Sequence, residues 1–178
     1  IGCGRHVEIT TGPYQGVEGA GPEYETCVAF GLLLQNDNLE SIAKSNDLCN
    51  RLGLDTISTG AVIAFAMECN EKNLLSTDDE EARRFTWGSH EATVRMVEKI
   101  GRREGFGDVL AEGVKRAAQK VGRGAEDLAL HVKGLELPGY DPRGVWGMAL
   151  TYAISDRGGC HLRAWTPMKE ILGDIPPL

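Results

Sequence analysis

The stretch CNRLGLDTISTGAVIAFAMEC, residues 49–69, predicts two helices joined by a tight turn. The apolar side chains that lead into it recur at helical spacing, and Asp37 or Asn38 is a suitable N-cap for this first helix. Gly53 stands where a helix commonly ends in the left-handed conformation. Residues 59–73 are apolar on most faces before a polar tail, which predicts a buried central helix.

Further helices are predicted after an acidic, loop-like stretch at residues 76–84. Ser89 is predicted to cap a helix with a stripe of Val94, Val97 and Ile100. A mainly α fold follows from these patterns.

The flanking regions carry weaker patterns. Residues 107–122 predict one helix capped by Asp108, and residues 128–144 predict a short extended run followed by turns. A short helix is predicted over residues 145–155, whereas residues 1–24 are rich in glycine and predict irregular structure. No internal repeat is visible.

Composition excludes several classes of protein. The 178 residues carry a net charge of −7, which argues against a nucleic acid or an anionic membrane as partner. The longest apolar run, AVIAFAMEC, is broken by Glu68, so no membrane span is predicted. Five cysteines without a pairing pattern or a visible secretory signal predict reduced thiols or metal ligands in a cytoplasmic protein. The chain opens on Ile rather than Met, and we expect it to be a piece of a longer protein.

Two acidic positions permit a structural and a functional interpretation. Glu25 precedes an apolar segment, where it either complements a helix dipole or serves as a general base. Asp55 follows the turn at Gly53 and either caps the next helix or, with Thr56, Ser58 and neighbouring amides, binds a heterocycle and a phosphate.

Four further residues also permit two interpretations. Asp141 and Arg143 flank a proline and form either an ion-paired turn or a grip for a phosphate or carboxylate. His161 is either a core residue or a neutral hydrogen-bond donor to a substrate oxygen. Cys3 is either a small residue between glycines or a cluster ligand whose partners lie elsewhere.

Five motifs occur in one order, and together they are more specific than any single one. They are IGCGR (1–5), GPEYET (21–26), the opening stretch (49–69), GLELPGYDPRG (134–144) and RGGCHLRA (157–164). With these motifs the chain strongly resembles the tungsten-containing aldehyde ferredoxin oxidoreductase family over nearly its whole length. The resemblance implies a multihelical bundle whose glycine-rich loops face a cofactor. It assigns residues 1–124 to the family's middle helical domain and residues 125–178 to the start of the C-terminal helical domain.

The resemblance implies an enzyme that oxidises aldehydes to carboxylic acids and passes electrons to ferredoxin. A tungsten held by two pterins of the molybdopterin type performs the two-electron step, and a [4Fe-4S] cluster transfers the electrons singly. Cys3 matches the last cysteine of the family's C-x-x-C-x-x-x-C cluster motif. Glu25 matches a carboxylate near tungsten, and His161 matches a histidine near the substrate oxygen.

The resemblance also assigns cofactor-binding residues. Residues 50–55 are similar to the pterin-binding pattern Asp-x-x-Gly-Leu-Asp, with Gly53, Leu54 and Asp55 matching and Asn50 replacing the first Asp. Asn50 keeps a hydrogen-bonding carbonyl but exchanges the charge for an amide donor. Asp141 and Arg143 are expected to help seat their loop near a pterin.

The glycine pair and the thiol of the last motif have separate predicted roles. Gly158 and Gly159 are expected to let the backbone approach the cofactor, and Cys160 is expected to pack as a small hydrophobe.

Alternatives remain at the level of function and assembly. Relatives in this family include subunits that reduce aromatic thioesters, and the isolated fragment can be a metal-free, inactive helical scaffold. The family's Glu-x-x-His site for a bridging iron is missing from the sequence, while a homodimer is left open. The expected partners are ferredoxin, an aldehyde substrate and the remaining domains of the full-length chain.

Overall fold

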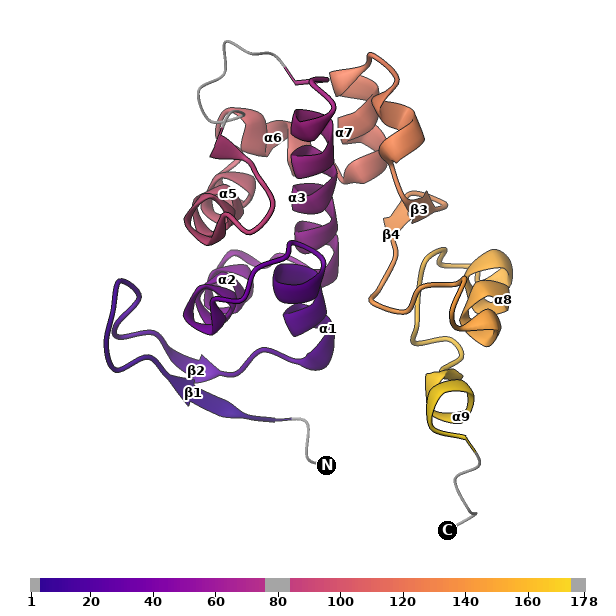
Figure 1. Cartoon of the computed structure of the whole chain (residues 1–178), viewed down its shortest axis with the longest axis horizontal. Helices are drawn as coiled ribbons and strands as arrows, with labels where there is room; N and C mark the ends of the chain where they lie inside the picture. Colours follow the sequence, from indigo (N-terminus) through magenta and orange to yellow (C-terminus); the bar gives the residue numbers. More distant parts are fainter. Residues whose placement is uncertain (1–3, 76–83, 174–178) are drawn as a thin grey trace.

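The computed structural model describes residues 4–75 and 84–173, which form a mainly α chain with short strands, as predicted (Figure 1). The elements, in chain order, are β1 (His6–Glu8), β2 (Glu18–Ala20), α1 (Tyr24–Cys27), η1 (Val28–Leu32), α2 (Leu39–Leu52), α3 (Thr56–Glu71), α5 (His90–Arg102), α6 (Phe106–Leu110), α7 (Val114–Val121), η2 (Ala125–Leu128), β3 (His131–Val132), β4 (Leu135–Glu136), α8 (Trp146–Ile154) and α9 (Pro167–Leu172). We call residues 24–128 the helical body and residues 131–173 the C-terminal segment.

The α2–turn–α3 unit confirms the prediction made from residues 49–69. The Asn38 side chain accepts a hydrogen bond from the Ser41 amide at 2.8 Å and caps α2. Gly53 ends α2 with φ of 70°. Asp55 then caps α3 by accepting from the Ser58 amide at 2.8 Å, so the turn is closed by a cap on each side.

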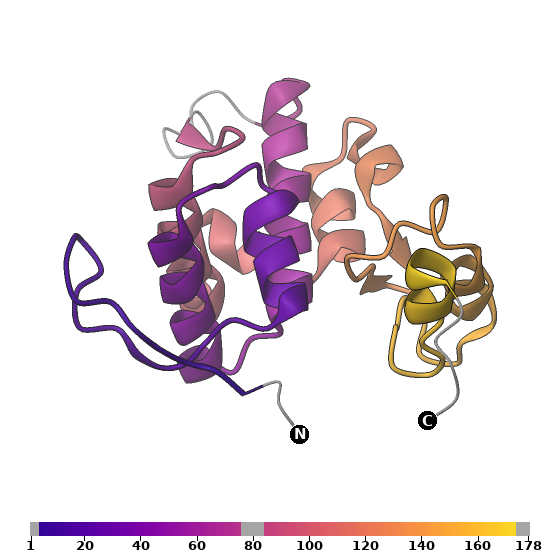
Figure 2. The ribbon, with the colours of Figure 1, turned by 60° about the horizontal axis from the view of Figure 1, so that its bottom comes forward.

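Helix α3 lies at the centre of the helical body, where α1, η1, α5 and α7 pack against it (Figures 1 and 2). Its side chains Ile63, Ala66 and Met67 are fully buried. At Gly60 the helix approaches η1 so closely that a Cβ atom would lie 2.6 Å from the Ala29 carbonyl oxygen. The apolar character of α3 on most faces therefore has a tertiary explanation, because neighbours cover it on several sides.

The later helices confirm one prediction and correct another. Val94, Val97 and Ile100 of α5 are buried as predicted. Ser89 stands at the predicted N-cap position, but its hydroxyl contacts the Thr86 hydroxyl and makes no capping hydrogen bond. The single helix predicted over residues 107–122 is wrong, since α6 ends at Leu110 and α7 begins at Val114.

The break between α6 and α7 has one local cause and one tertiary cause. Gly113 adopts φ of 81°, which a helix does not allow, and the Val114 amide donates outside the helix to the Glu136 carboxylate at 2.6 Å. Asp108 consequently lies inside α6, whose N-cap is Gly105.

Within the described chain, two pairs of short strands lie near the N-terminus and before α8. β1 and β2 pair in antiparallel register, with His6 opposite Ala20, so residues 1–24 contain a short hairpin in addition to the predicted irregular structure. β3 and β4 form the short hairpin predicted from the extended run.

The C-terminal segment lies beside the helical body and is joined to it through β3 and β4 (Figures 1 and 2). Ala125, just after the proposed domain division at 124/125, is buried in the main core, and the division itself stays a prediction. Within the described ranges, no single helix is long and apolar enough to cross a bilayer, and α2 with α3 meets that test only as a pair bent by 118°.

Candidate functional site

Glu25 is the centre of the candidate site. It lies in the first turn of α1 and is partly buried. One carboxylate oxygen, Oε2, accepts a hydrogen bond from the Gly139 amide at 2.8 Å. The other, Oε1, is buried and has no hydrogen-bond partner among the described residues. Buried polar atoms are nearly always paired in folded proteins, so an unpaired carboxylate oxygen marks a place where a ligand or water can bind.

Charges from distant parts of the chain act on this carboxyl. Burial raises the pKa of Glu25, the Gly139 amide and the nearby His161 lower the pKa in part, and the negative charge of Asp55 raises it further. The fold therefore brings Glu25, Asp55 and His161 within electrostatic reach of one another. Two of these residues were predicted to act together in catalysis, and the third was predicted to bind the cofactor.

Three tyrosines surround this group and were missed by the sequence reasoning. The Tyr24 and Tyr140 rings stack with centroids 5.7 Å apart, and the His161 ring lies 6.1 Å from Tyr140 in a tilted contact. The buried Tyr152 hydroxyl donates to the Tyr140 carbonyl at 3.1 Å, and burial with the Glu25 charge raises its pKa. Tyr24 and Tyr140 lie inside the quoted motifs GPEYET and GLELPGYDPRG, so their position was the available signal.

A second carboxylate, Glu136, was also missed. This residue is 4% exposed. Its carboxylate accepts hydrogen bonds from the Ser58 hydroxyl at 2.8 Å and from the Val114 amide at 2.6 Å. A glutamate between two leucines was the signal in the sequence, because an apolar neighbourhood for a charged residue predicts a specific set of partners.

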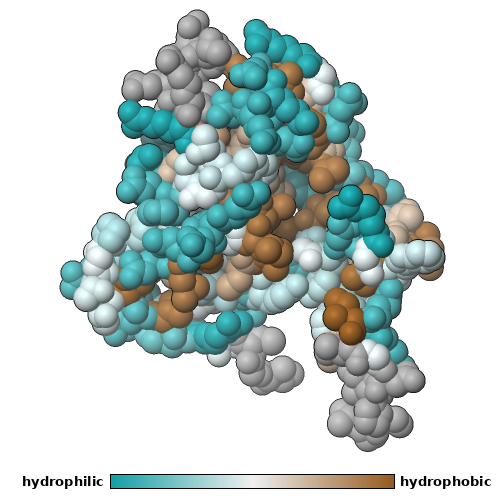
Figure 3. Space-filling model, viewed as in Figure 1, coloured by the Kyte–Doolittle hydropathy of each residue, from teal (hydrophilic) through white to brown (hydrophobic). Residues whose placement is uncertain are grey.

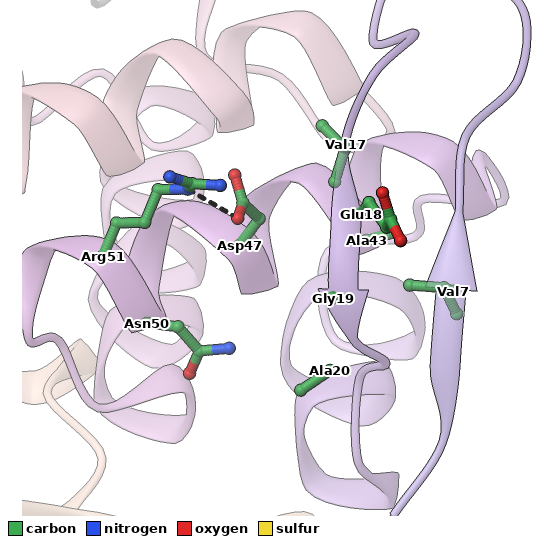
Figure 4. A pocket seen from close by; sticks show the side chains of 9 residues that line it. All are labelled: Val7, Val17, Glu18, Gly19, Ala20, Ala43, Asp47, Asn50 and Arg51. Atoms are coloured by element: carbon green, nitrogen blue, oxygen red, sulfur yellow. Dashed lines mark hydrogen bonds and ion pairs between the residues drawn. The ribbon is translucent and has the colours of Figure 1, made fainter.

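The predicted pterin-binding residues divide between two places. Gly53 and Asp55 form the turn and the cap described above, which confirms their structural interpretation, and Leu54 is packed against the main core. Asn50 lines an open pocket of about 440 Å³ between the β1–β2 strands and α2 (Figure 4). In that pocket Arg51 pairs with Asp47 at 2.7 Å. Cofactor binding by these residues stays a prediction.

Asp141 and Arg143 form the ion-paired turn that was one of their two interpretations. The guanidinium grips the carboxylate through Nε at 3.0 Å and Nη2 at 2.6 Å. These hydrogen bonds lower the pKa of Asp141 to about 2. The Arg143 side chain is also largely exposed. Its predicted binding of a phosphate or pterin stays a prediction.

The glycine pair has a packing role that the sequence did not reveal, while its approach to a cofactor stays a prediction. A Cβ atom on Gly158, which has φ of 96°, would collide with the Val132 carbonyl oxygen, and one on Gly159 would lie 2.8 Å from the Leu135 carbonyl oxygen. These glycines therefore let the chain approach the β3–β4 hairpin, which leaves His161 beside Tyr140. Cys160 is buried, as predicted.

The predicted metal ligand Cys3 lies outside the described residues. Among residues 4–75 and 84–173, no group of three or more His, Cys, Asp or Glu side chains is arranged to hold a metal ion. The cluster partners of Cys3 that the resemblance implies stay a prediction.

Nearly the whole chain matches one known protein family. The chain matches, over residues 1–177, the family described as aldehyde ferredoxin oxidoreductase, domains 2 and 3. It belongs to this family of oxidoreductases.

The relatives differ in their reactions. The tungsten-containing aldehyde ferredoxin oxidoreductases of Pyrococcus furiosus and Thermococcus kodakarensis are each 47% identical over 97% of this chain. The WOR-like subunit of an aliphatic sulfonate oxidoreductase from Pyrococcus furiosus is 31% identical over 98% of it. The chain spans only 28% of the length of the first two relatives and 29% of the third.

A solved structure is also similar. The active site complex BamBC of benzoyl coenzyme A reductase, bound to 1,5-dienoyl-CoA, superposes with a TM-score of 0.67 at 28% sequence identity. The match covers 87% of this chain and 23% of that chain.

Proposed function

We propose that the chain is part of an enzyme that oxidises aldehydes to carboxylic acids with ferredoxin as electron acceptor. Each aldehyde and one water give one carboxylic acid, two protons and two electrons, which ferredoxin accepts one at a time. The observation that carries the proposal is the buried, unpaired Oε1 of Glu25, a carboxylate on which His161 and Asp55 act from elsewhere in the fold.

The described residues fit a tungsten–bispterin centre, and the family resemblance adds a neighbouring [4Fe-4S] cluster to the proposal. The unpaired Glu25 Oε1 offers an acceptor, and the Asp55 carboxylate offers the oxygen Oδ2, which the helix cap does not use. Asn50, Gly53, Leu54 and Asp55 would hold a pterin, and Cys3 would ligate the cluster. When bound, the tungsten centre supplies the two-electron oxidation.

Asp141 and Arg143 have a supporting part in this proposal. Their ion pair stiffens the turn that follows Gly139 and Tyr140, and through it they would seat this loop near a pterin. The exposed guanidinium leaves N–H groups available on the solvent side.

The proton chemistry falls to Glu25 and His161. Burial raises the Glu25 pKa, which makes the carboxylate a stronger base than an exposed glutamate, and Oε1 would take the proton from water or substrate. His161 would donate a hydrogen bond to the aldehyde oxygen and favour attack at the carbonyl carbon. The Tyr24 and Tyr140 rings stack on each other, and Tyr140 contacts His161. These rings would limit access of water to the site.

A second candidate function is the reduction of aromatic thioesters. The similarity to the BamBC complex at a TM-score of 0.67 favours it, and the chain's own residues permit it. An activity panel of aldehydes and aromatic CoA thioesters, measured on a full-length enzyme that contains this sequence, separates the two candidates.

The exposed apolar face of α8 supports a larger assembly. Trp146, Leu150 and Ile154 recur at helical spacing and are 77%, 61% and 72% exposed. Figure 3 shows hydrophobic residues on the C-terminal segment and between it and the helical body. We assign this face to contact with the remaining domains of the full-length chain. The proposed enzyme is cytoplasmic and would form a homodimer. The 178-residue chain alone is then expected to be inactive and to carry neither tungsten nor iron, which elemental analysis checks.

Substitution in the full-length enzyme tests the assignment. Glu25→Gln and His161→Ala should each lower kcat by about 100-fold or more while tungsten content stays unchanged. Glu23→Gln, an exposed neighbour of Glu25, is the matched control and should keep full turnover. Normal turnover in both site variants would refute the proposal.

A further inference from the structure

Glu136 is a buried carboxylate that the proposed chemistry does not use. It is 4% exposed, and burying a carboxylate costs free energy unless hydrogen bonds compensate for the lost water. Glu136 has two such bonds, to the Ser58 hydroxyl on Oε2 and to the Val114 amide on Oε1. These partners lie 78 and 22 residues away in the sequence, so the carboxylate joins three separate segments.

The bond to Ser58 reaches the first turn of α3. The amide of this same serine donates to the Asp55 cap at 2.8 Å, and the Thr56 hydroxyl meets the Thr26 hydroxyl at 2.9 Å. Thr26 is the residue after Glu25 in α1. Glu136 is therefore linked, through the start of α3, to both the predicted pterin turn and the helix that carries Glu25.

The bond to Val114 reaches the start of α7. The first amides of a helix have no partner within the helix and favour a negative charge. A Cβ atom on the preceding Gly113 would lie 3.1 Å from Glu136 Oε1, so the glycine keeps the carboxylate close to the helix. This contact fixes Glu136 from a second side.

The backbone that follows Glu136 leads directly to the candidate site. Gly139, whose amide holds Glu25 Oε2, is only a few residues further along the chain. A Cβ atom on Gly139 would lie 2.5 Å from the Val28 Cγ1, so its backbone is packed tightly against η1. A shift at Glu136 would therefore be transmitted to the Gly139 amide, because so short a segment has little slack.

We propose that Glu136 is a positioning residue that locks β4 to α3 and α7, so that Gly139 holds one oxygen of Glu25 and leaves the other free to react. The inference rests on the proposed function, since it assigns the reacting oxygen to Glu25. Glu136 acts through Gly139 and touches neither substrate nor cofactor in this role.

The test is made on the full-length, tungsten-loaded enzyme with Glu136→Ala and Glu136→Gln. The alanine variant removes both hydrogen bonds and should lower kcat by about 100-fold, the cost of a small misplacement of a reacting group. The glutamine variant keeps an acceptor for Val114 and can donate to Ser58, so it should stay within about 3-fold of the parent. Glu126→Gln, an exposed glutamate of η2, is the control and should have no effect.

The pH profile of kcat/KM distinguishes positioning from a general loss of structure. Loss of the Gly139 hydrogen bond removes an influence that lowers the Glu25 pKa, so the acidic limb should move to higher pH in Glu136→Ala and stay in place in Glu136→Gln. The variants leave unchanged the other groups that face Glu25, which are His161, Asp55, Tyr24 and Tyr152.

Each outcome has one meaning. If Glu136→Ala keeps the parent's acidic limb, or if Glu136→Gln is as damaged as Glu136→Ala, the positioning role is wrong. If Glu136→Ala does not fold, Ser58→Ala, which removes one of the two bonds, should move the limb in the same direction by a smaller amount, and an unmoved limb overturns the inference. Glu25→Gln separates the two proposals, since a limb that survives this change refutes the function of Glu25 itself.

Discussion

The central helix α3 and the C-terminal helix α8 are both strongly apolar, yet the structure treats them differently. Neighbours cover α3 on several sides, and Ile63 and Met67 are almost completely buried. Helix α8 buries Met148 and Tyr152 against the β3–β4 hairpin, whereas Leu150 points to solvent. A helix that is apolar on most faces needs cover on most faces. The comparison shows that neighbouring elements cover α3 on most faces, whereas α8 keeps one apolar face uncovered.

The candidate site depends on both regions. Glu25 belongs to the helical body, while Gly139, Tyr140 and His161 belong to the C-terminal segment. The geometry of the site is therefore set by how the C-terminal segment packs on the helical body, and Glu136 lies at that junction.

The largest expected loss of stability comes from a substitution in the core of the helical body. Phe30→Ala, at a side chain that is 0% exposed, should lower the free energy of unfolding by about 3–5 kcal/mol, because it leaves a cavity. Ile154→Ala, on the exposed face of α8, is the matched truncation and should change it by less than about 0.5 kcal/mol. Urea unfolding of the 178-residue chain measures both, and comparable losses would contradict the contrast between the two regions.

A smaller effect is expected where the C-terminal segment folds on itself. Gly158→Ala should destabilise the β3–β4 hairpin and its surroundings by about 3 kcal/mol, since the new Cβ meets the Val132 carbonyl at an unfavourable φ. Gly124→Ala has a similar φ of 84° but open space around the Cβ, and should cost about 1 kcal/mol. Hydrogen exchange at the hairpin amides, together with urea unfolding, checks the difference, and equal costs would show that the close approach is unimportant.

The smallest effects are expected from pH, with opposite signs in the two regions. The raised pKa of Glu25 means that folding favours its protonated form, so stability should fall as pH rises from the ordinary value of 4.5 through the raised value. The pKa of Asp141, lowered from 3.8 to about 2, means that its contribution is present above pH 3.8 and is lost as pH falls toward 2. The Asp141 effect should be small, because the ion pair is exposed.

Two neutral variants isolate these contributions. In unfolding experiments over a pH series, Glu25→Gln should lack the loss of stability on the alkaline side, and Asp141→Asn should lack the loss on the acid side. Parallel profiles for the parent and Glu25→Gln would show that burial of this carboxyl has no energetic consequence.

Local features of the fold were predictable because their causes are local. The cap at Asn38, the left-handed Gly53 and the cap at Asp55 act within a few residues, and the buried stripe of α5 follows from its period. The break before α7 was not predictable, since it depends on Gly113 together with a carboxylate from β4. The role of Gly158 was missed for the same reason, because the atom it avoids belongs to Val132.

The amino-acid sequence was enough to predict the central helices and the motifs that place the chain in its family, and it offered the Asp55 cap and the ion-paired turn at Asp141 as one of two interpretations each. The fold alone reveals that the Gly139 amide, 114 residues from Glu25 in the sequence, holds one of its oxygens and leaves the other unpaired. The physical reason is range. Helix period and capping act between neighbours in the chain, whereas a hydrogen bond between distant residues forms only when the packing of every intervening element brings its two atoms to about 3 Å.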